Sequence, residues 1–167
     1  NGKSKSVQNN GKIIIGDKGY GALLGGQISN AGIVSARLGK IALGAGEKIT
    51  LDFVGDGLMS VSVPSEKLGF IKDINGNTLK SLISNTGLLK ANGGIIKLSA
   101  ATAKSLSRSS VNIGSSGVII ARSVNDKTGK VVIGSPTNNK IKIAGKIDVS
   151  GHKSLTPSGT IIVRGRS

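Results

Sequence analysis

The stretch Ser29–Val63, SNAGIVSARLGKIALGAGEKITLDFVGDGLMSVSV, contains short alternating apolar runs separated by glycine. Gly32–Ala36 sets a first pattern: glycine, any residue, a large aliphatic, any residue, a small or aliphatic residue. Gly39–Leu43 sets a second, with aliphatic residues two and four positions after the glycine. Because side chains alternate faces along a strand, each pattern predicts a five-residue strand with one apolar face. Strands this short are expected to stack on copies of themselves.

Both patterns recur along the chain in a fixed order. Copies of the first pattern occupy residues 87–91, 117–121 and 145–149, and copies of the second occupy 11–15, 94–98, 129–133 and 159–163. The first-pattern glycines, Gly32, Gly87, Gly117 and Gly145, lie 55, 30 and 28 residues apart, so the first interval is expected to hold two turns of the repeat. A repeat of about 28 residues with several strands is typical of a solenoid.

The repeat predicts an all-β fold, a right-handed parallel β-helix with three strands per coil and about 5–6 coils. Two stretches interrupt it and are expected to form lateral excursions near residues 64–84 and 100–110. Asn75-Gly76-Asn77 is a turn signal in the first, and the Ala/Leu spacing of Ala100–Ser107 predicts a short outer helix in the second. Residues 1–167 are interpreted as a single β-helix segment of a longer chain.

Composition narrows the class of protein. The chain has 26 glycines, one tyrosine, two phenylalanines, no tryptophan and no cysteine, so Ile, Val, Leu and Ala must fill the core. Without cysteine there are neither disulfides nor thiolate metal ligands. No apolar run approaches the roughly 18 residues of a membrane-spanning helix.

The net charge of +15 creates a field that attracts nucleic acid, acidic glycans and anionic surfaces. The interpretation we favour is a solvated outer face, because many lysines fall at outward positions of the expected strands, namely Lys12, Lys40, Lys90, Lys97, Lys130, Lys142 and Lys146. If the chain does hold a polyanion, Lys142, Lys146 and Arg164 are the candidate contacts. Basic residues without aromatic partners argue against specific nucleic-acid binding.

The residues needed for catalysis are sparse, so no catalytic, cofactor or metal site is predicted. Of the eight carboxylates, only Asp52 and Asp56 form a candidate pair, and it is a weak one. His152 is the only histidine and falls in an expected loop, so a zinc site or a catalytic triad lacks its residues. Gly19-Tyr20-Gly21 and Gly44-Ala45-Gly46 do not complete a phosphate-binding fingerprint and are predicted to be turns.

Several blocks resemble the filamentous haemagglutinin family of large exoproteins, which Gram-negative bacteria export by two-partner secretion. The resemblance covers roughly residues 20–165, keeps the order of the blocks, and rests on Ser29–Ala36, Gly39–Leu43, Ala45–Phe53, Gly57–Val63, Asn85–Gly94 and Ser115–Ser123. It implies a right-handed parallel β-helix in the stem of a secreted or cell-surface adhesin, haemolysin or contact-dependent inhibition toxin. The family's asparagine-proline secretion motifs are missing, so recognition by the outer-membrane transporter is not assigned to these residues.

The function expected from the sequence is therefore a non-enzymatic stem segment that spaces and presents a distal binding or toxic module. The full-length molecule would contact a host or neighbouring cell, and the outer-membrane transporter would be its partner during secretion. Three alternatives stay open: a glycan- or polyanion-binding segment, a protomer of an extracellular filament formed by end-to-end self-association, and a polysaccharide-active β-helix enzyme. Salt-dependent heparin binding would identify the first and concentration-dependent fibre growth the second.

Overall fold

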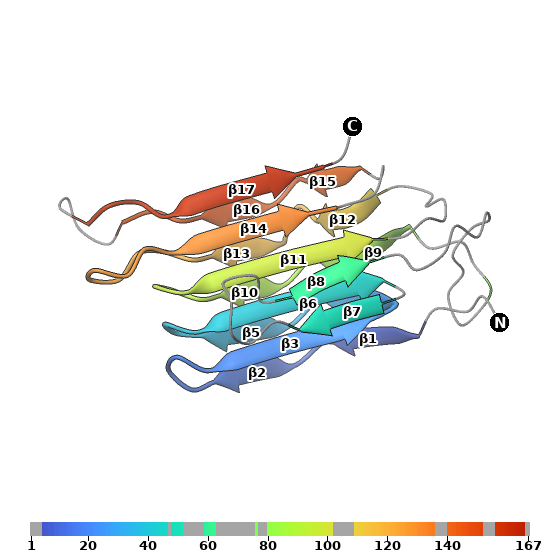
Figure 1. Cartoon of the computed structure of the whole chain (residues 1–167), viewed down its shortest axis with the longest axis horizontal. Helices are drawn as coiled ribbons and strands as arrows, with labels where there is room; N and C mark the ends of the chain where they lie inside the picture. Colours follow the sequence, from blue (N-terminus) through green and yellow to red (C-terminus); the bar gives the residue numbers. More distant parts are fainter. Residues whose placement is uncertain are drawn as a thin grey trace.

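The computed structural model describes residues 5–46, 48–51, 59–62, 76, 80–101, 109–135, 140–151 and 156–165. Within these residues the chain forms seventeen β-strands and no helix. Fifteen strands make three parallel sheets of five strands each, and the other two pair with each other (Figure 1). The predicted all-β class and the parallel stacking are confirmed.

The chain visits the three sheets in turn. Sheet I has the order β1 (Ser6–Asn9), β4 (Gln27–Asn30), β9 (Ser81–Asn85), β12 (Ser109–Ile113) and β15 (Ile141–Ile143). Sheet II has the order β2 (Lys12–Ile15), β5 (Ile33–Ala36), β10 (Leu88–Lys90), β13 (Val118–Ile120) and β16 (Lys146–Asp148). Sheet III has the order β3 (Tyr20–Gly25), β6 (Lys40–Gly46), β11 (Ile95–Ala101), β14 (Lys130–Gly134) and β17 (Thr160–Arg164).

Consecutive strands therefore form triples, with one strand in each sheet. Triple 1 is β1–β3, triple 2 is β4–β6, triple 3 is β9–β11, triple 4 is β12–β14 and triple 5 is β15–β17. In Figure 1 the triples succeed one another from blue at the bottom to red at the top. This arrangement is consistent with a parallel β-helix.

The longest interval between first-pattern glycines holds an inserted hairpin. Strand β5 pairs directly with β10, with Val34 opposite Leu89, so the prediction of two turns between Gly32 and Gly87 is wrong. The additional residues include β7 (Lys48–Leu51) and β8 (Met59–Ser62), which pair antiparallel. This hairpin contacts β6 and β11 on the outside of sheet III (Figure 1).

Both predicted excursions need narrower limits. Residues 81–84 belong to β9 in sheet I, so the first excursion ends before them; residues 64–75 and 77–79 lie outside the described part. Ala100 and Ala101 are buried at the end of β11, so the helix predicted to begin there is wrong for these two residues. Residues 102–108 also lie outside the described part, and β12 begins at Ser109.

Aliphatic columns run through the stack where the register places like residues opposite one another. Val34, Leu89, Ile119 and Ile147 occupy one column of sheet II, as predicted, and Ile13 extends it into triple 1. Sheet III contributes columns of the same kind, such as Ile41, Ile96 and Val131, and Leu43, Leu98 and Ile133. These inward residues of triples 2 to 4 are at most 2% exposed, whereas Lys90, next to Leu89, is exposed. The predicted assignment of faces is confirmed at this strand.

At Gly32, Gly39, Gly87, Gly94, Gly117, Gly145 and Gly159 the backbone of the preceding triple lies directly against the glycine, whereas at Gly129 the nearest backbone is that of Ala121 in the same triple. A Cβ atom placed at Gly94 would overlap the carbonyl oxygen of Gly39, and that oxygen accepts a 3.0 Å hydrogen bond from Ile95 N. The same relation links Gly87 to Gly32 and, through Leu88 N, gives a 2.9 Å hydrogen bond to Gly32 O. The two columns of glycines are Gly11, Gly32, Gly87, Gly117 and Gly145, and Gly19, Gly39, Gly94, Gly129 and Gly159. The assignment of residues 11–15 to the second pattern is wrong, because β2 pairs with β5 and so stacks on a copy of the first pattern in sheet II.

Other glycines lie inside strands. Gly21 belongs to β3, and Gly44 and Gly46 belong to β6, so the prediction that these residues form turns is wrong. In β6 the outward-facing Ala42 is fully buried, because the hairpin β7–β8 packs over this strand. Small residues suit a strand that another backbone approaches closely.

Candidate functional site

The three predicted polyanion contacts lie in triple 5 but in different sheets. Lys142 is in β15 of sheet I, Lys146 is in β16 of sheet II, and Arg164 is in β17 of sheet III. All three side chains are exposed. The structure therefore does not bring them together on one sheet, and their role in binding a polyanion stays a prediction.

The described carboxylates gather where sheet II leads into sheet III, which we call the II–III corner. Asp17 lies between β2 and β3, Asp126 lies between β13 and β14, and Asp148 ends β16. Each has a basic partner there: Asp17 pairs with Arg37, Asp126 with Lys127 at 3.6 Å, and Asp148 with Arg122 at 2.7 Å. Negative charge is thus confined to one edge of the described structure.

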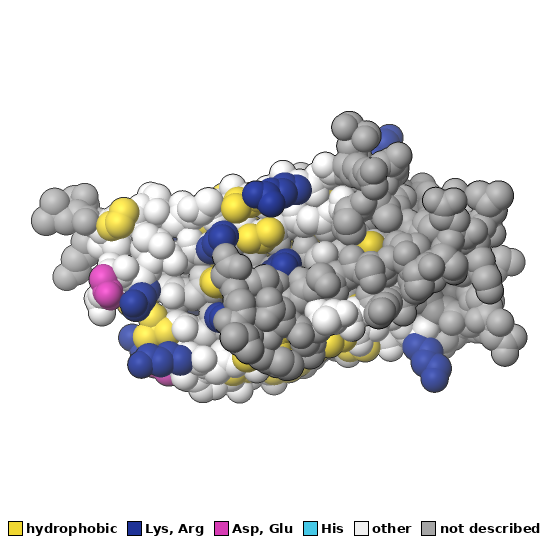
Figure 2. Space-filling view, in the orientation of Figure 1, with side chains coloured by type: hydrophobic (Ala, Val, Ile, Leu, Met, Phe, Trp, Pro, Cys, Tyr) yellow, Lys and Arg dark blue, Asp and Glu magenta, His cyan; other side chains and the backbone are white. Residues whose placement is uncertain are grey.

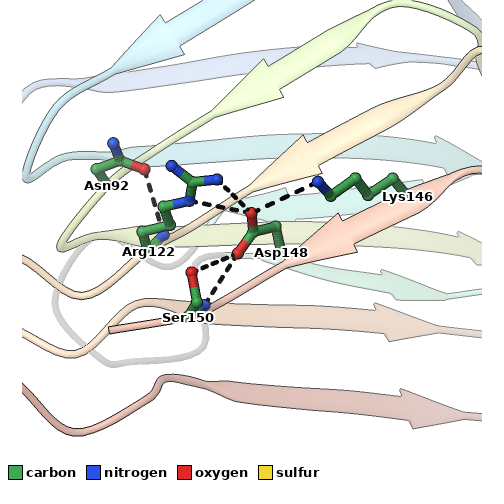
Figure 3. A network of polar contacts seen from close by, with 5 residues as sticks. All are labelled: Asn92, Arg122, Lys146, Asp148 and Ser150. Carbon is green, nitrogen blue, oxygen red and sulfur yellow. Dashed lines mark hydrogen bonds and ion pairs between the residues drawn. The ribbon is translucent and has the colours of Figure 1, made fainter. Parts of the chain in front are cut away.

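Asp148 is the centre of the most extensive polar network at this corner (Figure 3). Its Oδ2 accepts hydrogen bonds from Arg122 Nη2 at 2.7 Å and Arg122 Nε at 3.0 Å. Its Oδ1 accepts from Ser150 N at 3.0 Å and Ser150 Oγ at 2.8 Å, while Lys146 Nζ lies 3.9 Å from Oδ2. The side chain is only 10% exposed.

These hydrogen bonds stabilise the charged form of Asp148. The Arg122 guanidinium and then the Ser150 donors hold the pKa of the Asp148 carboxyl well below its usual range. The same pairing raises the pKa of Arg122. A carboxylate this acidic is a poor general base at neutral pH. Arg122 N also donates to Asn92 Oδ1 at 3.2 Å, so the network joins triples 3, 4 and 5. The network therefore holds these three triples together, and we call it the Asp148 clamp.

Positive charge is distributed differently, and most clearly on the outer face of sheet III. Each of triples 2 to 5 places one cation there, in the order Lys40, Lys97, Lys130 and Arg164. Lys40 and Lys130 share a column, two triples apart. No described carboxylate lies on this face, and Figure 2, which views the molecule from this side, shows cations beside small apolar patches. The arrangement depends on register, which the sequence pattern did not supply.

Buried asparagines form a polar column that the sequence interpretation missed. Asn9 Nδ2 donates to Asn30 Oδ1 at 2.8 Å, and Asn30 Nδ2 donates to Asn85 Oδ1 at 2.7 Å. Asn85 Nδ2 then donates to Gly87 O at 3.1 Å. The sequence does carry a sign of this column, because each asparagine precedes by two residues a glycine of the column that begins with Gly11. The amides satisfy one another, so the column offers no free group to a ligand.

The remaining sequence candidates are not placed. Asp52, Asp56 and His152 lie outside the described residues. Among the residues that are described, no three histidine, cysteine or carboxylate side chains gather as a metal site would require. No helix in the described part is both long and apolar enough to cross a membrane.

Comparison of the chain with protein-family models, with curated proteins and with solved structures found no match. The resemblance to the filamentous haemagglutinin family thus stays a prediction that rests on the sequence blocks. The site that the geometry offers is a surface with segregated charge on a stack of parallel strands.

Proposed function

We propose that this chain is a non-catalytic stem segment of a secreted bacterial exoprotein of the filamentous haemagglutinin kind. In this proposal the strands form a right-handed β-helix of five coils outside the cell. The segment spaces and presents a distal adhesive or toxic module, which contacts the host or a neighbouring cell. An outer-membrane transporter exports the full-length molecule.

The observation that carries this proposal is the continuity of the columns along the stack. The three sheets pair strand by strand from triple 1 to triple 5, with aliphatic side chains inside and glycine carbonyls bonded from each triple to the next. Each step adds one strand spacing of about 4.8 Å, so four steps give a section about 19 Å long. A structure whose length is set by its number of repeats is suited to act as a spacer.

A second candidate, binding of an acidic glycan or another polyanion, is favoured by the outer face of sheet III. Each of triples 2 to 5 places a cation on that face, at three positions along the strands, and no described carboxylate lies there, so the face is positively charged. The described acids, by contrast, are paired with basic residues at the II–III corner.

Binding to immobilised heparin over a series of salt concentrations separates the two candidates. A stem segment is expected to bind weakly and to elute below about 0.15 M salt, because exposed charges are screened there. The test compares two variants: Lys142→Ser, Lys146→Ser and Arg164→Ser together, which changes three sheets, and Lys40→Ser with Lys130→Ser, which changes one column. Submicromolar binding that persists at this salt concentration, and is lost in either variant, would replace the stem proposal with the binding one.

A further inference from the structure

The outer face of sheet II differs in chemistry from the outer face of sheet I. The outward column of sheet I is polar in every triple and consists of Gln8, Ser29, Ser84, Asn112 and Lys142. In sheet II the corresponding column is aliphatic in triples 2 to 4 and consists of Ile33, Leu88 and Val118. We call these three residues the outer aliphatic column. Their strands are therefore apolar on both faces.

Parallel strands that are apolar on both faces are typical of sheets that are covered on both sides. The three side chains of the outer aliphatic column are nevertheless partly exposed, as is Ile120 beside them. The hairpin β7–β8 covers part of sheet III, whereas no described strand packs across the outer face of sheet II. Further triples of the same geometry would lengthen this face and would leave it open.

Lysines surround the outer aliphatic column. Lys12 and Lys146 continue it in triples 1 and 5, and Lys90 lies in the adjacent outward column. All three lysines are exposed. Among the described residues, the only carboxylate at an outward position of this sheet is that of Asp148, which both Arg122 and Lys146 share. The face is therefore apolar in the middle and has a net positive charge around it.

The dimensions of this face fit an α-helix that lies across the strands. Neighbouring strands are about 4.8 Å apart, so the column from Lys12 to Lys146 is about 19 Å long. An α-helix rises about 5.4 Å per turn and covers this length with about 13 residues. In an extended peptide, side chains on one face recur only every 6.6 Å or so, and they would soon fall out of step with the column.

We infer that the outer face of sheet II binds an acidic amphipathic helix of a separate protein. The aliphatic stripe of that helix would cover Ile33, Leu88 and Val118, and its carboxylates would pair with Lys12 and Lys146. A helix that binds in this way uses side chains at positions i, i+4 and i+7 as anchors. This interaction goes beyond the spacer role, because it gives the side of the stem a partner.

The charge and composition of this face argue against three other occupants. A second copy of the chain carries +15 and would be repelled. Residues 63–79, the longest stretch outside the described part except for Gly76, contain two acids and two lysines and so lack the required negative charge. A lipid surface is favoured by tryptophan or phenylalanine, and no outward residue of sheet II is aromatic.

A synthetic helical peptide of about 14 residues tests the inference. Its leucines are at positions i, i+4 and i+7 and its glutamates are at both ends, and in a second peptide lysines replace the glutamates. Fluorescence anisotropy at about 0.15 M salt measures the binding of each peptide to the purified chain. The glutamate peptide is expected to bind at least tenfold more tightly than the lysine peptide.

Two pairs of variants locate the binding. Leu88→Ser removes the centre of the outer aliphatic column and should weaken binding of the glutamate peptide about tenfold. Val132→Ser is its matched control, because Val132 is a partly exposed outward aliphatic residue of sheet III, and it should bind like the original chain. Lys12→Ser with Lys146→Ser should weaken binding more than Lys40→Ser with Lys130→Ser, which removes the same charge from sheet III. If Leu88→Ser does not fold, the two lysine variants decide.

Four results would overturn the inference. The first is no saturable binding of the glutamate peptide up to about 1 mM, and the second is equal weakening by the sheet II variants and their sheet III controls. The third is Leu88-dependent binding to vesicles of anionic lipid, which would make the occupant a membrane. The fourth is Leu88-dependent self-association in sedimentation, which would make it a second copy. None of these results would affect the stem proposal, since that rests on the columns inside one copy.

Discussion

At the scale of single residues, adjacent positions in a strand have opposite environments. Leu89 is fully buried between Val34 and Ile119 in sheet II, while Lys90 points to solvent. Alternation along a strand was sufficient to predict this pair from the sequence. It was insufficient for Arg122 and Asp148, which are 26 residues apart and meet only because the II–III corner stacks one triple on the next.

The first prediction compares the two faces of β10. Leu89→Asp buries an unpaired charge and leaves a void, so it should lower the free energy of unfolding by about 3–5 kcal/mol. Lys90→Asp changes an exposed side chain and should cost under about 0.5 kcal/mol. Urea denaturation measures both. Equal losses would contradict the assignment of faces in sheet II.

The second prediction concerns the pH dependence of the Asp148 clamp. The folded-state pKa of Asp148 is depressed, so its stabilisation is present above the unfolded pKa of about 3.9 and is lost as pH falls towards the folded value. Asp148→Asn should therefore lower the melting temperature at pH 7, and the difference from the original chain should shrink below about pH 4.

Asp126→Asn is the control for this clamp, because the Asp126 side chain is 81% exposed and its ion pair with Lys127 is on the surface. It should change the melting temperature little at any pH. A constant difference for Asp148→Asn from pH 7 to pH 2 would show that the carboxylate charge is not what stabilises the corner.

At the scale of elements, strand pairing depends on close backbone contact at the two glycine columns. The sequence predicted strands that begin at all of these glycines except Gly19, which was predicted to lie in a turn. It did not predict the backbone contact that requires glycine at these positions. The sequence interpretation also took the hairpin β7–β8 for a turn of the repeat. Short runs of alternating apolar residues occur both in parallel coils and in antiparallel hairpins, so the pattern alone does not distinguish them. Gly44 and Gly46 were misplaced because a glycine in a covered strand looks like a turn residue.

The third prediction tests a glycine column. In Gly94→Ala the added methyl group would overlap Gly39 O, so β11 must move away from β6 and strain the 3.0 Å bond between Ile95 N and Gly39 O. We expect a loss of about 1–3 kcal/mol in urea denaturation. Gly134→Ala, whose added methyl group meets nothing within 4 Å, should stay within about 0.5 kcal/mol of the original chain. Equal stability of the two variants would show that steric overlap does not explain glycine in this column.

At the scale of the whole molecule, composition predicted the sign of the charge but not its location. A net charge of +15 was visible in the sequence, whereas the pairing of the described acids at one corner and the cations across sheet III depends on register. The candidate contacts Lys142, Lys146 and Arg164 were predicted to form one cluster, but each lies in a different strand of triple 5, and the three strands belong to three different sheets. For a repeat of this kind, residues one period apart are the better candidates for a shared surface.

The asparagine column affects which triples pair with each other. In a chain of similar repeats, two triples that are not neighbours can pair by mistake. The glycine and aliphatic patterns would let one triple align with several others, and a chain that skipped a triple would still bury aliphatic side chains. Asn9, Asn30 and Asn85 follow one another in the column, and Ile113 and Ile143 succeed them. A mistaken pairing that set Ile113 beside Asn9 or Asn30 would leave a buried amide without its partner, at a cost of about 1–3 kcal/mol. The three asparagines thus disfavour pairing of triples 1 and 2 with triple 4, where isoleucine takes the asparagine position.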